Sequence, residues 1–167
     1  MTILKRNQEQ NNGIKYFSSC SYRRKLDTAI DFYCNILGCT KGNSEVNPPD
    51  AWVDINFWGN ELTLHASTPK EELHDKIEGL ELHNVDMGVV LVPHFGVHLE
   101  PEDFRTLKKR LEENNIPYVS KPYIRFKNSD LEQETMFIKD PHCNVLEIKT
   151  LKNPEHLFDP NVTSTAY

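Results

Sequence analysis

The sequence is 167 residues long, and its 19 basic and 25 acidic side chains give a formal net charge of -6. A chain of this length can build one domain-sized core, and an acidic balance without a long lysine or arginine block is not the charge pattern of a nucleic-acid-binding protein. The chain has no apolar run of about 18 residues and no apolar signal-peptide centre near its start. We therefore expect a soluble, cytoplasmic protein that binds neither nucleic acid nor membranes.

The first half of the chain predicts a strand, a helix and then a β-hairpin. Apolar residues at helical spacing run from Leu26 to Leu37, and Gly38 follows where a C-cap glycine would stand. The dipeptide Gly59-Asn60, between two strand-like runs, is a hairpin signal. The expected strands cover residues 14–20, 51–58 and 61–66.

The second half predicts the same kinds of element in the same order. Pro101, at an early helix position, leads into a helix that stops at Asn114-Asn115. A turn at residues 140–144 separates the last two strands. The expected strands cover residues 88–99, 117–126, 134–139 and 145–151. Each half is therefore interpreted as strand, helix, strand, strand, strand.

This repeated order predicts one domain over residues 14–151, built from two modules. Module one would cover 14–66 and module two 85–151, with a charged linker over 67–84 between them. Within the linker, residues 70–77 favour a short surface helix. The two ends, residues 1–13 and 152–167, are predicted to be loosely held tails.

Three potential metal ligands, His65, His94 and Glu147, each stand in a separate strand-like run. A carboxylate is costly to bury in an apolar strand unless a cation or hydrogen bonds offset the cost, so Glu147 predicts a partner. If the two halves pack around a common cleft, these strands can point all three side chains inward. Two imidazoles and one carboxylate with open positions suit zinc, iron, manganese or nickel.

An ordinary interpretation of each residue stands beside this one. A single strand histidine is more often a hydrogen-bonded structural residue than a ligand, and only the repeated order of elements favours the metal site. His98 shares a strand face with His94, but four strand residues span roughly 13 Å. His98 is therefore a candidate for the rim of the site.

A series of short motifs runs in order from residue 14 to residue 151. They are Asp31-Phe32-Tyr33 with Leu37-Gly38, Phe57-Trp58-Gly59-Asn60-Glu61-Leu62 before His65, Pro93-His94-Phe95-Gly96-Val97, Arg125-Phe126-Lys127, and Met136-Phe137 through Asp140-Pro141 and Asn144 to Leu146-Glu147. In this order they resemble the glyoxalase, bleomycin-resistance and extradiol dioxygenase superfamily, whose members are also called vicinal oxygen chelate proteins. The series is similar above all to an uncharacterised glyoxalase-like branch of that superfamily.

The resemblance implies an α+β fold of two βαβββ modules, whose curved mixed sheets form a cleft. It implies metal ligands on the fourth strand of module one and on the first and last strands of module two, at His65, His94 and Glu147. At the first-strand position where this branch usually has histidine, the chain has Ser18. A serine hydroxyl is a poor ligand for these metals.

The resemblance also implies a metal-dependent enzyme, a lyase, an isomerase or a dioxygenase, that acts on a small oxygen-rich molecule. Glu147 would bind the metal and could also move a proton. Arg125 would bind a substrate carboxylate in the cleft, and Phe57 and Phe95 would line the cleft.

Two other functions stay open from the sequence. One is a metal-free protein that binds or sequesters a small molecule, as bleomycin-resistance proteins do, in a cleft lined by Trp52, Phe57, Trp58 and Phe95. The other is a scaffold or dimerisation module without chemistry. Members of the superfamily often pair so that their modules complete each other's sheets, and a homodimer is expected.

Overall fold

The computed structural model describes residues 16–21, 23–45, 51–67, 81–85, 88–92, 94–159, 161 and 162. The predicted N-terminal tail, the larger part of the predicted linker and the short helix predicted over residues 70–77 lie outside the described residues. Within the described part of the chain, no helix is both long and apolar enough to cross a membrane.

The first module is a four-stranded mixed sheet with one helix. Its elements are β1 (Tyr16–Ser21), α1 (Arg23–Ile30), the π-helical continuation η1 (Asp31–Ile36), β2 (Thr40–Glu45), β3 (Trp52–Phe57) and β4 (Asn60–Ser67). The strand order is β1-β4-β3-β2, with β1 parallel to β4 and the other pairs antiparallel. The module therefore has the predicted order of strand, helix and three further strands.

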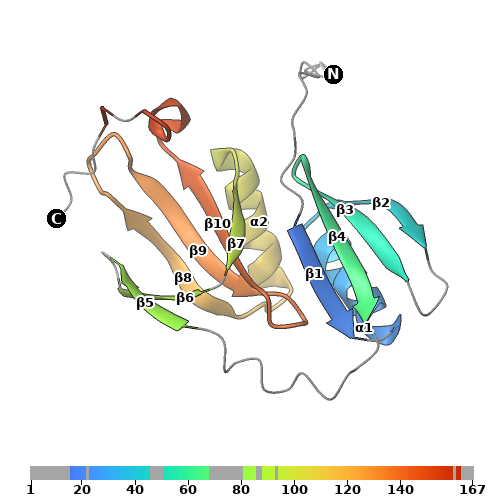
Figure 1. Ribbon diagram of the computed structural model, residues 1–167. Coiled ribbons are helices and arrows are strands. Elements are labelled where there is room, and N and C mark those ends of the chain that lie inside the picture. The colour runs from blue at the N-terminus through green and yellow to red at the C-terminus, as the bar shows by residue number, and fades with distance from the viewer. Residues whose placement is uncertain are drawn as a thin grey trace, which may run out of the picture.

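The second module repeats this topology. Its elements are β7 (Phe95–His98), α2 (Pro101–Glu113), β8 (Tyr118–Arg125), β9 (Gln133–Lys139) and β10 (Val145–Leu151). The strand order is β7-β10-β9-β8, and here β7 is parallel to β10. Figure 1 shows one helix on the back of each sheet. The α+β fold of two βαβββ modules that the sequence predicted is confirmed.

The structure corrects the strand predicted over residues 88–99, which is two strands. β6 (Gly88–Val92) pairs with β5 (Glu81–Val85) in a separate two-stranded sheet, whereas β7 pairs with β10. The sequence has Pro93 between β6 and β7, and proline has no N–H to donate to a ladder. β5 also begins inside the segment that the sequence assigned to the linker. A short 3-10 helix, η3 (Pro154–His156), follows the last strand.

The hairpin between β3 and β4 turns one residue earlier than its sequence signal indicated. Phe57 pairs with Asn60, so Trp58 and Gly59 are the two turn residues. Both have positive φ, 50° at Trp58 and 91° at Gly59, which is typical of tight hairpin turns that follow the strand twist. The turn therefore holds a tryptophan in a backbone conformation that most residues avoid.

Each sheet buries one face against its helix. The alternation along β4 and β10 buries Leu62, Leu64, Leu146 and Ile148, each 0% exposed. His65 and Glu147 occupy the opposite faces of these two strands, because successive strand side chains alternate. The candidate ligands therefore lie on the faces away from the helices.

The two modules share one hydrophobic core. The rings of Phe57 and Phe95, one from each module, have centroids 5.9 Å apart. Tyr33, in η1, donates a buried 3.0 Å hydrogen bond to Oδ2 of Asp140, which follows β9. Asp140 also accepts hydrogen bonds from the backbone N–H groups of His142 and Asn144. The ring contact and the hydrogen bond from Tyr33 hold the modules against each other, and the two backbone bonds hold Asp140 in place.

Candidate functional site

Two of the three predicted metal ligands lie together on the second sheet. Nε2 of His94 is 3.5 Å from Oε2 of Glu147. Glu147 is 9% exposed, and the side chain of His94 is 24% exposed. The ring of His94 also packs edge-on against Phe137, with ring centroids 5.3 Å apart. The two side chains are therefore partly shielded from water, the carboxylate more than the imidazole.

Glu147 has two further partners on the same sheet. Nζ of Lys149 is 3.0 Å from Oε2, the same oxygen that faces His94. The hydroxyl of Thr135 donates to Oε1 at 3.2 Å, and Thr135 is 0% exposed. The partner that the sequence predicted for Glu147 thus includes an ammonium group and a hydroxyl of the chain itself.

The strand register explains why these groups meet. Lys149 is two residues after Glu147 in β10, so both side chains lie on one face. Thr135 in β9 is directly opposite Lys149 in the antiparallel pair. On the other side of β10, Gly96 in β7 is opposite Glu147. A Cβ at Gly96 would lie 1.9 Å from the backbone oxygen of Glu147, so only glycine lets β7 approach this closely.

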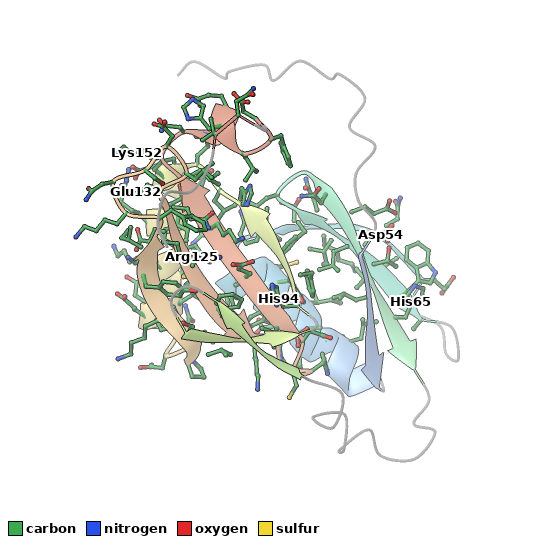
Figure 2. The ribbon with its side chains drawn as sticks, turned by 60° about the vertical axis from the view of Figure 1, so that its left-hand side comes forward. Asp54, His65, His94, Arg125, Glu132 and Lys152 are labelled. Carbon is green, nitrogen blue, oxygen red and sulfur yellow. The ribbon has the colours of Figure 1, made fainter. Side chains whose placement is uncertain are left out.

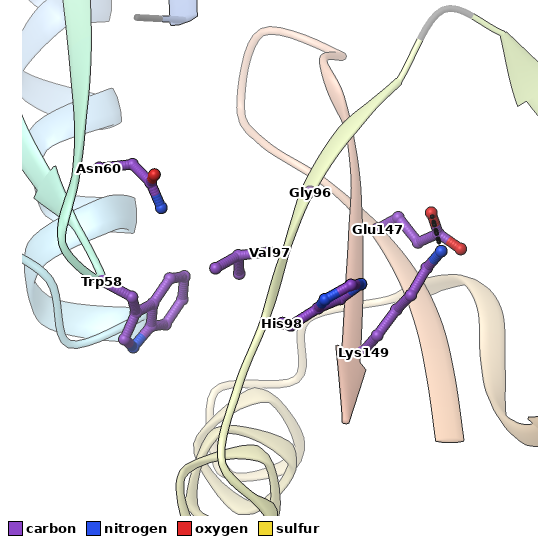
Figure 3. Close-up of a pocket in the computed structure, with 7 residues that line it drawn as sticks. All are labelled: Trp58, Asn60, Gly96, Val97, His98, Glu147 and Lys149. Carbon is purple, nitrogen blue, oxygen red and sulfur yellow. Dashed lines mark ion pairs between the residues drawn. The ribbon is translucent and has the colours of Figure 1, made fainter. Parts of the chain in front are cut away.

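A cavity of about 390 Å³ opens beside Glu147. Its lining residues are Trp58, Asn60, Gly96, Val97, His98, Glu147 and Lys149. Figure 3 shows Trp58 and Asn60 of the first module on the side that faces β7, and His98 beside Lys149 in the second module. Desolvation lowers the pKa of His98, Lys149 lowers it further, and Glu147 opposes both. The cavity is therefore lined by the indole of Trp58 and by the charged side chains of Glu147 and Lys149. His98 also lines it, in agreement with its sequence-based assignment to the rim of the site.

His65 does not join the other two candidate ligands. It lies on β4 of the first sheet, is exposed, and pairs in register with Ser19 and Trp52. Figure 2 shows it well apart from His94. Across the described ranges, no group of three histidine, cysteine, aspartate or glutamate side chains is close enough to hold a metal ion. The convergence of all three ligands therefore stays a prediction.

The first strand supplies no imidazole to the site. Residues 16–21 contain no histidine, and Ser18 is in register with the buried Leu64 rather than with His65. Its neighbour Ser19 is the residue in register with His65. No other residue of β1 therefore supplies the histidine that the family pattern has at the position of Ser18.

The three predicted substrate-binding residues lie in different surroundings. The structure places Phe57 in the core, 0% exposed, where its ring contacts Tyr33, Trp58 and Phe95. Phe95 is partly buried and packs against that core. The guanidinium of Arg125 lies over the ring of Phe126, 4.7 Å from its centroid. None of the three lines the cavity beside Glu147.

The distance between His94 and Glu147 can be compared with that in a metal site. Two donors that each lie about 2.1 Å from one ion are about 3.0 to 3.4 Å apart at octahedral or tetrahedral angles. The observed separation of 3.5 Å is close to this range. His94 and Glu147 thus fit two neighbouring positions around one divalent ion, and water or ligand oxygens would complete the shell.

Sequence reasoning did not assign a role to Lys149 or Thr135. The signal for Lys149 was its place two residues after Glu147 in a predicted strand, which puts both on one face. The signal for Thr135 was the hairpin turn at residues 140–144, because its length sets which residues of β9 and β10 face each other. Both assignments needed the register rather than the residue types alone.

Comparison with solved structures finds proteins of similar fold. A glyoxalase/bleomycin resistance protein/dioxygenase from Alicyclobacillus acidocaldarius is 26% identical, with a TM-score of 0.61, and the match covers 90% of this chain and 100% of that chain. A glyoxylase/bleomycin resistance protein/dioxygenase domain from Frankia sp. EAN1pec is 14% identical, with a TM-score of 0.58 and coverage of 88% and 97%.

The fosfomycin resistance protein FosX from Listeria monocytogenes is also similar, at 10% identity and a TM-score of 0.52. The match covers 85% of this chain and 93% of that chain. A mutant of FosX has been solved in complex with Mn(II) and a dihydroxypropylphosphonic acid. No protein-family model and no curated protein matches the sequence. The chain has the fold of the vicinal oxygen chelate superfamily, as the order of its motifs predicted.

Proposed function

We propose that this chain is a metal-dependent enzyme of the vicinal oxygen chelate type, acting on a small oxygen-rich molecule in the cavity beside Glu147. The observation that supports it most is the 3.5 Å separation of His94 Nε2 and Glu147 Oε2, which suits two donors to one ion. The Mn(II) complex of FosX, a protein of the same fold, agrees with a divalent ion without deciding which one is used here.

In this proposal His94 and Glu147 hold the ion, and zinc, iron, nickel or manganese all suit these donors. The sequence also predicts His65 as a ligand, but it lies apart from the other two, so the ion is assigned to His94 and Glu147. When bound, a divalent ion supplies Lewis-acid polarisation of a carbonyl or enolate oxygen. The identity of the bound ion and of the substrate would determine whether the enzyme is a lyase, an isomerase or a dioxygenase.

The residues of the chain itself have separable roles. Thr135 holds Oε1 of Glu147 and so fixes the plane of the carboxylate, while Oε2 faces His94 and Lys149. Trp58 gives the substrate an apolar wall. A carboxylate held in this way can also accept a proton from the substrate and return it. We therefore propose Glu147 as the proton carrier as well as a ligand.

The size of the cavity limits the substrate. About 390 Å³ lies near the lower end of the range of small-molecule sites, so the substrate is a small metabolite rather than a polymer. We further propose that the enzyme works in the cytoplasm as a homodimer. The edge strands are β1 and β2 in the first sheet and β7 and β8 in the second, and their outer edges pair with no strand of the described part. Sheet edges of this kind favour pairing.

The first test is the metal content of untagged protein purified without chelator. We expect about one divalent ion per chain in the wild type and a large loss in His94→Ala, because one of two protein donors is removed. His65→Ala is the matched control, since it deletes an exposed imidazole on the other sheet, and it should keep its metal.

Two outcomes would contradict the proposal. Wild-type protein that binds no metal even after reconstitution would replace the enzyme by the metal-free binding protein, to be followed by ligand screening. Metal lost in His65→Ala but kept in His94→Ala would move the site to the first sheet. Unchanged turnover in Glu147→Gln, with metal retained, would remove the role of Glu147 as proton carrier.

A further inference from the structure

We propose that Lys149 is a tethered cation that exchanges partners. Its ammonium group pairs with Glu147 until a divalent ion binds there, and it then turns to an anionic group of the substrate. The inference rests on the proposed metal site and adds a substrate class, small molecules with a carboxylate, phosphate or sulfate-like group. It also assigns a binding role to a residue that the family resemblance does not mark.

The first step is competition for one oxygen. Nζ of Lys149 lies 3.0 Å from Oε2 of Glu147, and Nε2 of His94 faces the same Oε2. An ion held by His94 and Glu147 would lie about 2.1 Å from this oxygen, so the ion and the ammonium would be no more than about 5 Å apart. Two cations at this distance repel strongly in a partly buried site. Metal binding therefore displaces the ammonium from Glu147.

The second step concerns where the displaced ammonium goes. The side chain of Lys149 is 21% exposed and lines the cavity, so the cavity lies within reach of the displaced ammonium group. An ammonium group that is partly buried without a partner is unfavourable. The cavity is the space within its reach, and an anionic ligand there would replace Glu147 as its partner.

Binding of a divalent ion also changes the net charge of the cavity lining. Glu147 and Lys149 form a neutral pair, and a divalent ion added to it leaves two net positive charges beside the cavity. The remaining lining residues, Trp58, Asn60, Gly96, Val97 and His98, bring no carboxylate to balance them. A site with this charge attracts anions, because the low-dielectric protein around the cavity screens the electric field less than water does. Metal binding and anion binding should therefore support each other.

The test compares wild type with Lys149→Met, using Mn(II) alone as the first probe and inorganic sulfate as the second. Mn(II) affinity is measured by competition with a chelator, and sulfate binding to Mn(II)-loaded protein by calorimetry. We expect Lys149→Met to bind Mn(II) about 10-fold or more tightly than wild type, since the competing cation is gone. The same variant should bind sulfate about 10-fold or more weakly.

Two control variants sharpen the result. Lys149→Arg keeps the positive charge and should stay close to wild type in both assays. Lys152→Met removes a charge of the same sign three residues away, from a side chain that is 56% exposed and 4.0 Å from Glu132, and should change neither affinity. If Lys149→Met proves unstable, Lys149→Gln is measured in its place, because its neutral amide can still hydrogen-bond to Glu147.

The outcomes separate this inference from the proposed function. Tighter Mn(II) binding with weaker sulfate binding supports the exchange. Equal Mn(II) affinity in wild type and Lys149→Met overturns the exchange and leaves the metal site standing. Tighter Mn(II) binding with unchanged sulfate binding overturns the anion role. Absence of Mn(II) binding in every variant, including Lys149→Met, contradicts the proposed function itself and the inference with it.

Discussion

Glu147 is the residue on which the candidate site depends. Its two carboxylate oxygens face groups from three segments, namely His94 before β7, Thr135 in β9 and Lys149 in β10 itself. A buried carboxylate is tolerated when its lone pairs meet donors, and it becomes costly when one donor is removed. The sequence predicted that Glu147 needs a partner, and the register of the sheet supplies one without any group from outside the chain.

The contribution of the Thr135 hydroxyl to stability can be measured by comparison with that of the Thr150 hydroxyl. Thr135→Val keeps the shape but removes the donor to Oε1, so we expect a loss of about 1 to 3 kcal/mol in the free energy of unfolding. Thr150 is the matched control, because its buried hydroxyl has no hydrogen-bond partner within the described residues. Thr150→Val should be neutral or slightly stabilising. Urea denaturation of both variants measures this, and equal losses would show that the bond to Glu147 contributes nothing special.

At the scale of residues, the sequence predicted the chemistry better than the geometry. The sequence predicted that His65, His94 and Glu147 would meet in a common cleft, and of these three the structure brings His94 and Glu147 together. His65 has an equally suggestive sequence environment, yet its strand belongs to the other sheet. Which sheets approach each other depends on packing between modules, and no local pattern encodes that packing.

Among the secondary-structure elements, β7 is short and depends on its contact with β10. It has four residues, and Gly96 at its centre allows the close approach to the backbone of Glu147. Because β7 follows His94 directly, its position also sets the distance between His94 and Glu147. The strand therefore links the packing of the second sheet to the geometry of the candidate metal site.

Gly96→Ala should disturb both the fold and the site. The added Cβ would overlap the backbone oxygen of Glu147, which cannot rotate away, so β7 must shift; we expect a loss of about 1 to 3 kcal/mol in stability and a lower metal content. Gly42→Ala is the control, because its nearest contact would be Cβ of Asp54 at 3.2 Å. Thermal unfolding and metal analysis check this, and a Gly96→Ala protein like wild type in both would show that the approach is not needed.

The elements that the sequence predicted well are those with a strong local signal. Helix α2 begins at Pro101 and ends beside Asn114, and β9 and β10 flank the predicted turn. β2 has no strand-like run of its own, since all six of its residues are exposed and none of them is a strand-favouring apolar residue, and only the repeated order of elements predicted a further strand in this half. Edge strands of this kind are formed by pairing with a neighbour, so their own pattern is a poor guide to them.

For the whole molecule, the main feature is that two modules of like topology share one core. The ring contact of Phe57 with Phe95 and the hydrogen bond from Tyr33 to Asp140 cross between them. The cavity is also lined by both modules, with Trp58 and Asn60 from one and Glu147 and Lys149 from the other. Contacts of this kind couple the stability of one module to that of the other.

The modules should therefore unfold together. Both tryptophans, Trp52 and Trp58, belong to module one, so fluorescence reports that module while far-UV circular dichroism reports both. We expect coincident transitions in wild type, and Tyr33→Phe should lower both midpoints by the same amount because it removes a buried bond to a carboxylate. Asn35→Ala, which removes an exposed bond to Asp31, is the control. Separate transitions for the two probes in wild type would contradict the coupling.

The matching strand orders of the two sheets have a consequence for fragments of the chain. A cut anywhere between residues 67 and 81 leaves every strand pairing and both helices intact, because no described sheet contains strands from both sides of that segment. Each piece would expose apolar side chains that are buried in the common core of the intact chain. The hydrophobic effect would therefore favour their recombination. The cavity would form again only with recombination, since Trp58 and Asn60 belong to one piece and Glu147 and Lys149 to the other. Joining the two halves and forming this cavity would therefore be the same event.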